Sequence, residues 1–336
     1  MRVLGVGNYG FVVEGRRPAT VEKIVSVEEY QNVPEAAIQR ESSRHCCHVP
    51  PVHDWYVCDD EQCPCFANVR YAELPTTIGG IEVEQDSWVG IDGGRVIAPC
   101  GTGPAPPEEL EQLQLLDKPS HCHIITQRID GVSLEEYAVG CSQRRMRLVC
   151  LQVFNALATL QAACPGFRHN DLHAANVLVS QADGKRSLAY RNTGQNVFLR
   201  HGDPVVHIID FGFASCMATP SPMVRASAEA PPFEAHGICD QHCPQFDMHR
   251  FATGVLPYLR ANKRVSGDGE LKRLLCACAK GETELGAELQ VQLRRRADAV
   301  GLTSIDGCAV AYGDLTPARC CAAQCFASLW SPCQFG

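Results

Sequence analysis

Residues 169–176 read HNDLHAAN and stand directly before VLV, an apolar run that is typical of a strand. Further along the chain a second apolar run, VVHIID, ends at Asp210. Phosphoryl transfer needs a carboxylate near the attacking hydroxyl group and at least two oxygen ligands for Mg²⁺. Asp171 can supply the carboxylate, and Asn176 and Asp210 can supply the ligands. Each residue alone fits a loop cap or an Asx turn, but their order favours one catalytic site.

A glycine-rich segment, GVGNYG at 5–10, lies between two strand-like runs. Glycines at this spacing let backbone N–H groups approach phosphate oxygens, where a Cβ atom would obstruct them. A dinucleotide-binding fold needs a helix after the third glycine. Here FVVEG continues as a strand, so we expect a strand–loop–strand cover for phosphates, with a plain tight hairpin as the alternative. Lys23, on the next strand, would point its ammonium group toward those phosphates or into solvent.

The remaining helices and strands are predicted from the spacing of apolar residues and from helix-capping residues. Ser133 with Glu136 three residues later forms a capping box at a helix start, and residues 147–161 carry apolar side chains at helical spacing. A polar stretch around Gly194 predicts a small hairpin. We expect three strands within 1–25, further strands at 52–57, 123–129, 177–179 and 205–210, and helices at 34–45, 133–139 and 147–161.

Beyond residue 245 the pattern is helical to the end of the chain. Cys321 and Cys325 lie one helical turn apart and in line with Leu329, which favours a core stripe over a site. Trp330 and Phe335 would then anchor a last helix. Strands first and helices afterwards indicate an α+β protein with a β-rich front and a helical back.

Twenty cysteines are many for a chain of 336 residues. The N-terminus has no charged segment followed by an apolar one, so we expect no secretory signal and reduced, buried thiols rather than disulfides. One cluster within 45–65 could instead hold a structural zinc ion, although its spacing fits no standard zinc motif. Its members are His45, Cys46, Cys47, His48, His53, Cys58, Cys63 and Cys65.

Composition narrows the classes of partner. The formal net charge is −8, which gives no support to direct nucleic-acid binding. No run of apolar residues is long enough to span a bilayer, so we expect no membrane association and an intracellular protein. Residues 58–120 are rich in Gly and Pro and predict an insertion of short strands and loops.

Taken together, these motifs resemble the eukaryotic-type protein kinase superfamily. The segment at 5–12 matches G-x-G-x-x-G-x-V, and HNDLHAAN and Asp-Phe-Gly at 210–212 match the catalytic loop and the metal-binding motif. The chain is most similar to the Ser/Thr protein-kinase-like proteins of large DNA viruses. The resemblance implies a bilobal fold, with an N-lobe at 1–126 that contains the insertion and a mainly helical C-lobe at 127–336. It also implies protein substrates, and a place in the host cytoplasm, the host nucleus or the virion.

The resemblance also implies roles for individual residues. ATP with Mg²⁺ or Mn²⁺ would be the cofactor, and Asp171, Lys23, Asn176 and Asp210 would carry catalysis, Asn176 and Asp210 as metal ligands. Glu35 would pair with Lys23, with Glu41 as the alternative. The residues expected to contact the nucleotide are Gly5, Val6, Gly7, Gly10, Val12, Val21, Lys23, Thr126, Gln127 and Ile129. Those expected to support the site are Glu35, His169, Phe211, Gly212 and Asp247.

The chain departs from the family at several positions, which keeps other functions open. Asn170 replaces an arginine that would receive an activation-loop phosphate, and His173 replaces the lysine that is typical of Ser/Thr kinases. The loop pattern therefore also resembles small-molecule kinases of the aminoglycoside and choline type. A catalytically silent pseudokinase scaffold is a third hypothesis. Glu234 lies near the place of a conserved family glutamate, but it matches poorly.

Overall fold

The computed structural model of the chain describes residues 3–7, 10–26, 34–58, 77–78, 81–82, 90–92, 95–97, 121–184, 186–190, 195–219, 245–279 and 315–332. The chain divides into two compact units. Unit 1 comprises Met1–Ala36 and Pro51–Arg128, and unit 2 comprises Ala37–Pro50 and Ile129–Gly336. The sequence placed all of 1–126 in the first lobe, whereas Ala37–Pro50 groups with unit 2.

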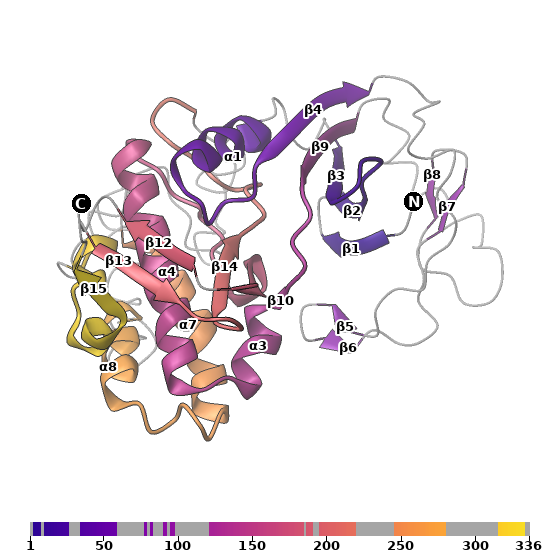
Figure 1. Cartoon of the computed structure of the whole chain (residues 1–336). Helices are drawn as coiled ribbons and strands as arrows, with labels where there is room; N and C mark the ends of the chain where they lie inside the picture. The colour runs from indigo at the N-terminus through magenta and orange to yellow at the C-terminus, as the bar shows by residue number, and fades with distance from the viewer. Residues whose placement is uncertain are drawn as a thin grey trace, which may run out of the picture. The chain divides into compact units, whose positions relative to one another are not determined.

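Unit 1 is built on a five-stranded antiparallel sheet with the order β1-β2-β3-β9-β4 (Figure 1). Gly15 closes the turn between β2 and β3, where its N–H donates to the Thr20 carbonyl at 3.0 Å. A Cβ atom at this position would collide with the Thr20 side chain, so only glycine fits. The strands are β1 Val3–Gly7, β2 Gly10–Glu14, β3 Thr20–Ser26, β4 Val52–Cys58 and β9 His121–Gln127.

A buried polar cluster joins the three strands β3, β9 and β4. The carboxylate of Glu22 accepts hydrogen bonds from the Tyr56 hydroxyl at 3.0 Å and from His123 Nδ1 at 2.9 Å. The rings of Tyr56 and His123 stack with their centroids 4.6 Å apart. Because Glu22 and His123 are almost fully buried, these bonds satisfy polar groups that would otherwise oppose folding.

Helix α1 (Pro34–His45) begins at the predicted proline. After it, His48 belongs to unit 2 and is bonded to two of its strands. Its Nδ1 donates to the Val206 carbonyl at 2.9 Å, and its Nε2 accepts from the Tyr190 hydroxyl at 3.0 Å. Most of the predicted insertion at 58–120 lies outside the described residues. Its described parts are two short hairpins, formed by β5 Thr77–Ile78 with β6 Ile81–Glu82 and by β7 Gly90–Asp92 with β8 Arg95–Ile97.

The core of unit 2 is organised around helix α4 (Gln143–Ala163). Phe154 lies at its centre, with ring centroids 5.9 Å from Phe251 and 6.2 Å from Phe326. By length and composition, α4 is the one described helix that could cross a membrane. Most of that helix is buried inside unit 2, as is usual for the core helix of a globular protein.

Two small antiparallel sheets complete the strands of unit 2. One has the order β10-β11-β14 and begins its strand β11 directly after the loop at 169–176, and the other has the order β12-β13-β15. The hairpin of β12 and β13 is the one predicted around Gly194. The strands are β10 Val132–Ser133, β11 Val177–Gln181, β12 Arg186–Tyr190, β13 Gln195–Leu199, β14 Pro204–Ile208 and β15 Trp330–Pro332.

The prediction of helix to the end of the chain is wrong for the last described residues. Helix α11 (Pro317–Cys321) ends early, because Ala323 has an extended backbone, and a 3-10 helix η3 (Gln324–Leu329) follows. Trp330 then opens strand β15, which pairs with β13, and Phe335 lies outside the described residues. Cys321, Cys325 and Leu329 are buried, as predicted for a core stripe, but they belong to two separate elements.

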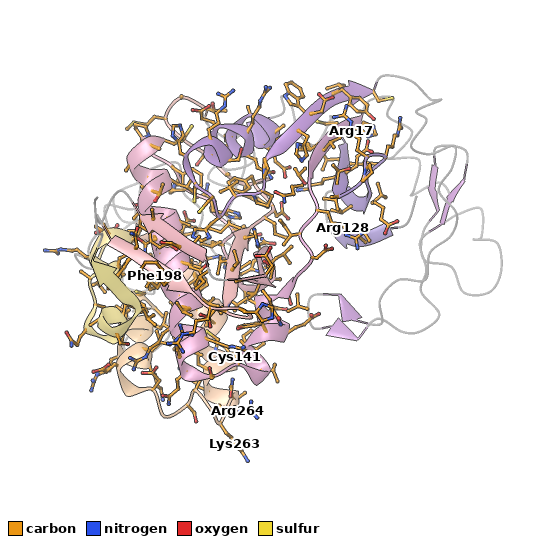
Figure 2. All side chains as sticks on the ribbon, in the orientation of Figure 1. Arg17, Arg128, Cys141, Phe198, Lys263 and Arg264 are labelled. Atoms are coloured by element: carbon orange, nitrogen blue, oxygen red, sulfur yellow. The ribbon has the colours of Figure 1, made fainter. Side chains whose placement is uncertain are left out.

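The other helices of unit 2 lie around α4 (Figure 1). They are α3 Leu134–Gly140, α7 Phe246–Ala261 and α8 Gly269–Cys278. Ser133 caps α3 as predicted, since its hydroxyl accepts from the N–H of Glu136 at 3.3 Å. After α7, Asn262 donates to the carbonyls of Ala138 at 2.6 Å and Cys141 at 3.1 Å. Figure 2 shows Cys141 and Arg264 on this side of unit 2.

The described residues thus form a mixed α+β protein with a sheet-rich N-terminal part and helices later in the chain. This is the fold class that the order of strand-like and helix-like segments predicted.

Candidate active site

The backbone of the loop at 169–176 is held by one buried carboxylate, which belongs to Asp247 on helix α7. Asp247 has no exposed surface, and its two oxygens accept from the backbone N–H groups of His169 and Asn170, each at 2.8 Å. Burial raises the pKa of Asp247, although the nearby His169 and the two N–H donors oppose that rise. Asp247 therefore fixes the backbone immediately before Asp171.

Two residues of this region have left-handed backbone angles. Among the described non-glycine residues with positive φ are Asn170 at 66° and Asp210 at 63°. Asn and Asp adopt this conformation more readily than other residues. The Asn170 side chain also donates to the Phe213 carbonyl at 2.8 Å and to the Ser215 hydroxyl at 3.0 Å. Asn170 thus ties the loop to the segment after Asp210, a role that its short amide suits.

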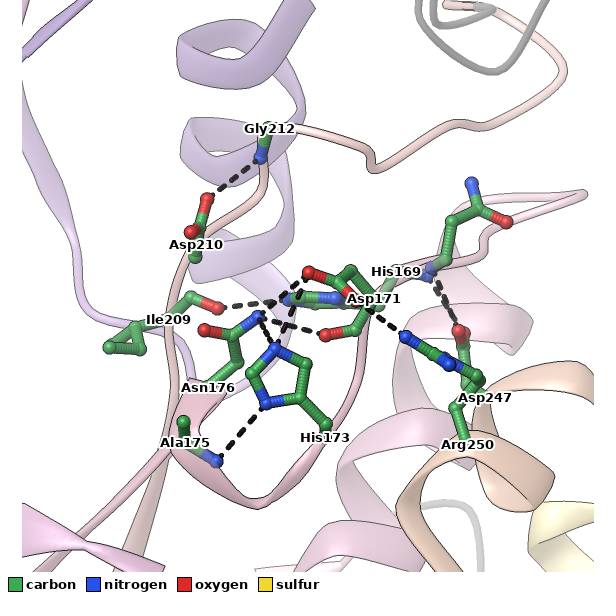
Figure 3. Close-up of polar contacts among 11 residues, drawn as sticks. His169, Asp171, His173, Ala175, Asn176, Ile209, Asp210, Gly212, Asp247 and Arg250 are labelled. Carbon is green, nitrogen blue, oxygen red and sulfur yellow. Dashed lines mark hydrogen bonds and ion pairs between the residues drawn. The ribbon is translucent and has the colours of Figure 1, made fainter. Parts of the chain in front are cut away.

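Asp171 and Asn176 are brought into direct contact. Asn176 Nδ2 donates to the Asp171 carbonyl at 2.9 Å and lies 3.3 Å from Asp171 Oδ2. With its nitrogen turned toward Asp171, the Asn176 amide has its oxygen on the other side, as Figure 3 shows. Asn176 is the last residue of the 3-10 helix η2 (Ala174–Asn176), which follows Asp171 in the loop.

His173 contributes a second contact to Asp171. Its Nδ1 accepts from the Ala175 N–H at 3.2 Å, and its Nε2 lies 3.2 Å from Asn176 Nδ2. That Nε2 lies 3.5 Å from Asp171 Oδ2. The His173 ring therefore contacts both Asn176 and Asp171.

Arg250 on helix α7 contacts the other oxygen of Asp171, at 2.9 Å from Nη2 to Oδ1. Burial raises the pKa of Asp171, but hydrogen bonds from His173 and Arg250 outweigh it and hold this pKa well below its usual range. Gly254 follows on the same face of α7, where a Cβ atom would lie 3.3 Å from Ala174 N. The helix therefore approaches the loop closely at three successive turns.

Asp210 is presented beside this loop by the end of strand β14. The carbonyl of Asn176 accepts from the Ile209 N–H at 3.0 Å, and His169 Nε2 donates to the Ile209 carbonyl at 2.9 Å. The carboxylate of Asp210 is exposed and accepts from the Gly212 N–H at 3.3 Å. Phe211 is fully buried, with its ring centroid 5.1 Å from that of His169. The sequence motifs at 169–176 and 210–212 thus lie side by side (Figure 3).

These residues fit a magnesium ion by the chemistry of their donors. Asn176 offers an amide oxygen that faces away from Asp171, and Asp210 offers an exposed carboxylate. Mg²⁺ prefers such oxygen ligands and keeps several waters, so two protein ligands are enough.

Unit 1 contains the other charged pair that the sequence predicted. Lys23 Nζ on β3 lies 2.7 Å from Glu35 Oε1 at the start of α1, and the Glu35 side chain is only 2% exposed. Glu41, the alternative partner, is instead bonded to Arg44 and His45 on its own helix. The geometry therefore favours Glu35 over Glu41.

The residues predicted to contact the nucleotide have defined places in the sheet of unit 1. Gly7 and Gly10 are the pair that closes β1 and β2, Val12 pairs with Lys23, and Val21 pairs with Thr126. Gln127 ends β9 and donates to the Pro51 carbonyl at 3.1 Å. Gly5 and Val6 lie in β1, and Ile129 is the first residue after the break between the units.

The cluster that the sequence left open as a zinc site lies only partly within the described residues. There, no three His, Cys, Asp or Glu side chains are grouped as metal ligands. Cys46 is buried, which raises its pKa to about 12, and both nitrogens of His48 are hydrogen-bonded. His45 is bonded to Glu41, whereas Cys63 and Cys65 lie outside the described residues, as does Glu234.

Arg250 is the site residue that sequence reasoning missed. Its only signal is its position three residues after Asp247 in FDMHRFA, which places both on one face of a helix.

No family model matches the chain, and no curated protein matches it.

Proposed function

We propose that the chain is an ATP- and Mg²⁺-dependent protein serine/threonine kinase with a protein-kinase-like fold. The observation that carries this proposal is the arrangement at the catalytic loop. Asp171 touches Asn176, Asp247 holds the loop backbone, and Ile209 joins the loop to the strand end that presents Asp210. A carboxylate beside two oxygen ligands is what phosphoryl transfer requires of a protein.

Asp171 is suited to orient the acceptor. Its low pKa keeps the carboxylate ionised near neutral pH, so it can accept a hydrogen bond from a serine or threonine hydroxyl. As the hydroxyl oxygen bonds to the γ-phosphorus and the bond to ADP breaks, the hydroxyl proton can pass to Asp171. Asn176 and Asp210 would hold Mg²⁺, which supplies positive charge against the phosphates. Catalysis on this scheme rests on positioning and charge.

Lys23 supports the same proposal from unit 1. A lysine that is held by a nearly buried glutamate is fixed in position, which suits it to bind phosphate oxygens. The neighbouring glycines of β1 and β2 offer backbone N–H groups for the same purpose.

A protein acceptor is favoured over a small molecule by two motifs together. The glycine segment at 5–10 is complete, and the motif at 210–212 retains its phenylalanine, which is buried against His169. The small-molecule kinases that HxDLHxxN also resembles rarely have both.

The test compares Asp171→Asn with wild type in the transfer of labelled phosphate from ATP to casein or to the chain itself. We expect a loss of at least about 100-fold, which is typical when a positioned acid or base is removed. Asp183→Asn is the matched control, because Asp183 is exposed on a turn of the same unit. Calorimetry with MgATP shows whether each variant still binds nucleotide.

Three other outcomes would contradict the proposal. Equal, undetectable transfer by wild type and Asp171→Asn with either Mg²⁺ or Mn²⁺ would indicate a scaffold. Transfer to a sugar, choline or an aminoglycoside but never to protein would indicate a small-molecule kinase. A wild-type rate in Asp171→Asn would remove Asp171 from the reaction.

A further inference from the structure

Both carboxylate oxygens of Asp171 are held by neighbouring side chains. Arg250 Nη2 lies 2.9 Å from Oδ1, while Asn176 Nδ2 lies 3.3 Å and His173 Nε2 3.5 Å from Oδ2 (Figure 3). A carboxylate that is held at one oxygen only can rotate about its Cβ–Cγ bond, because this torsion is broad. Contacts at both oxygens restrict that rotation.

The Arg250 contact is the strongest of the three. It is the shortest, and it joins opposite charges, and such hydrogen bonds are roughly twice as strong as neutral ones. The backbone of Arg250 is fixed by its place on α7, one turn after Asp247, which holds the loop backbone. Arg250 Nε is buried and has no hydrogen-bond partner among the described residues. The side chain makes its hydrogen bond to Asp171 through Nη2.

We propose that Arg250 is a positioning residue for phosphate transfer, which holds the Asp171 carboxylate in the orientation that receives the acceptor hydroxyl. This inference rests on the proposed function. An ionised carboxylate has about four lone-pair sites, two on each oxygen, and the single contact of Oδ1 leaves a site on that oxygen for the acceptor. Arg250 thus acts through Asp171 and need not touch ATP or the acceptor.

A purely structural role for Arg250 is the competing explanation. In that case the residue would only join α7 to the loop, and its loss would lower stability and activity together. A positioning role instead predicts a loss in kcat that a free guanidinium ion can repair in folded protein. Urea, which has a similar shape and no charge, separates the effect of charge from the filling of space.

The experiment measures kcat and KM of Arg250→Ala, Arg250→Lys and Arg260→Ala for phosphate transfer to casein. Arg260 is the matched control, because it lies exposed near the end of the same helix. We expect kcat of Arg250→Ala to fall about 10- to 100-fold, as for the loss of a hydrogen bond between charged groups. The KM for ATP should stay within about twofold, since the lost contact orients the transition state only.

Rescue gives the decisive readout. Guanidinium at millimolar concentration should restore part of kcat in Arg250→Ala but not in Asp171→Asn, and urea should restore neither. Arg250→Lys should be intermediate, because it keeps the charge but loses the planar geometry. If Arg250→Ala does not fold, Arg250→Gln carries the same expectations.

The outcomes separate the two proposals. Wild-type transfer with an unchanged kcat in Arg250→Ala would overturn the role of Arg250 and leave the proposed function intact. A folded Arg250→Ala whose loss neither lysine nor guanidinium repairs would also overturn it, in favour of the structural role. A wild type without any transfer would overturn both proposals.

Discussion

Asp247 illustrates how a single buried side chain can set the geometry of a whole loop. It accepts two backbone hydrogen bonds at 2.8 Å from adjacent residues, and the second of these, Asn170, has φ of 66°. A left-handed backbone at a non-glycine residue costs about 1–3 kcal/mol and persists only where its surroundings fix it. Asp247 provides that fixation.

We therefore predict that Asp247→Asn destabilises unit 2 and abolishes phosphate transfer. An asparagine turns an NH₂ group toward one of the two N–H donors, so that donor loses its partner and the other loses a charged acceptor. The free energy of unfolding should fall by about 2–4 kcal/mol, in line with lost hydrogen bonds to a buried charge. Urea denaturation measures this change, with Asp183→Asn as the control. An unchanged midpoint would show that Asp247 does not hold the loop.

At the residue scale, sequence predicted the contacts that lie within short motifs. Asp171 and Asn176 are five positions apart, so the short turn that ends in η2 brings them together within the loop. Arg250 is different, because its contact with Asp171 depends on how α7 packs under the loop. No local pattern encodes that packing, and an arginine on a helix more often faces solvent.

At the scale of elements, one ion pair joins two helices of unit 2. Asp268 caps α8 by accepting from the Leu271 N–H at 3.2 Å, and it is bonded to Arg147 of α4 at 2.6 and 2.7 Å. Arg147 also donates to the Cys325 carbonyl at 2.8 Å, in η3. A single arginine therefore links α4 to α8 and to the C-terminal segment.

We predict that Arg147→Leu lowers the free energy of unfolding by about 2–4 kcal/mol, because the nearly buried carboxylate of Asp268 loses its partner. The matched control is Arg145→Leu on the same helix, where the side chain is exposed. Guanidinium chloride is unsuitable for a charged pair, so urea unfolding is the measurement. Equal midpoints for the two variants would show that the pair adds nothing to stability.

Elements with strong local patterns were predictable, and those made by distant pairing were not. The capped helix at Leu134 and the apolar helix α4 follow from Ser133 and from helical spacing. Strand β15 has no such pattern, because WSP is short and becomes a strand by pairing with β13. The helical spacing of Cys321, Cys325 and Leu329 was real, but the extended backbone at Ala323 breaks it.

At the scale of the whole molecule, a buried histidine couples stability to pH. His249 lies in α7 within unit 2, and burial lowers its pKa to about 4, with a smaller contribution from Arg250 and an opposing one from a hydrogen bond at Cys278. The unfolded chain binds a proton at this residue near pH 6.5. Between these values the unfolded state holds more protons, so stability must fall as pH decreases.

We predict that His249→Gln removes roughly 3 kcal/mol of the loss of stability that wild type shows between pH 7 and pH 4, because a shift of one unit corresponds to about 1.4 kcal/mol. Urea denaturation at a series of pH values measures it. Since carboxylates also titrate below pH 5, the difference between variant and wild type near pH 5.5 is the most specific signal. Parallel curves over this range would contradict the prediction.

The last described strand has a consequence for how the protein folds during synthesis. Strand β13 lies between β12 and β15, but β15 follows it only after α7, α8, α11 and η3. During synthesis β12 and β13 leave the ribosome long before Trp330 is made. Until then one edge of β13 has unpaired backbone N–H and C=O groups that can pair with other strands. We expect this hairpin to be a binding site for chaperones on nascent chains, and translation pauses before residue 330 to promote aggregation.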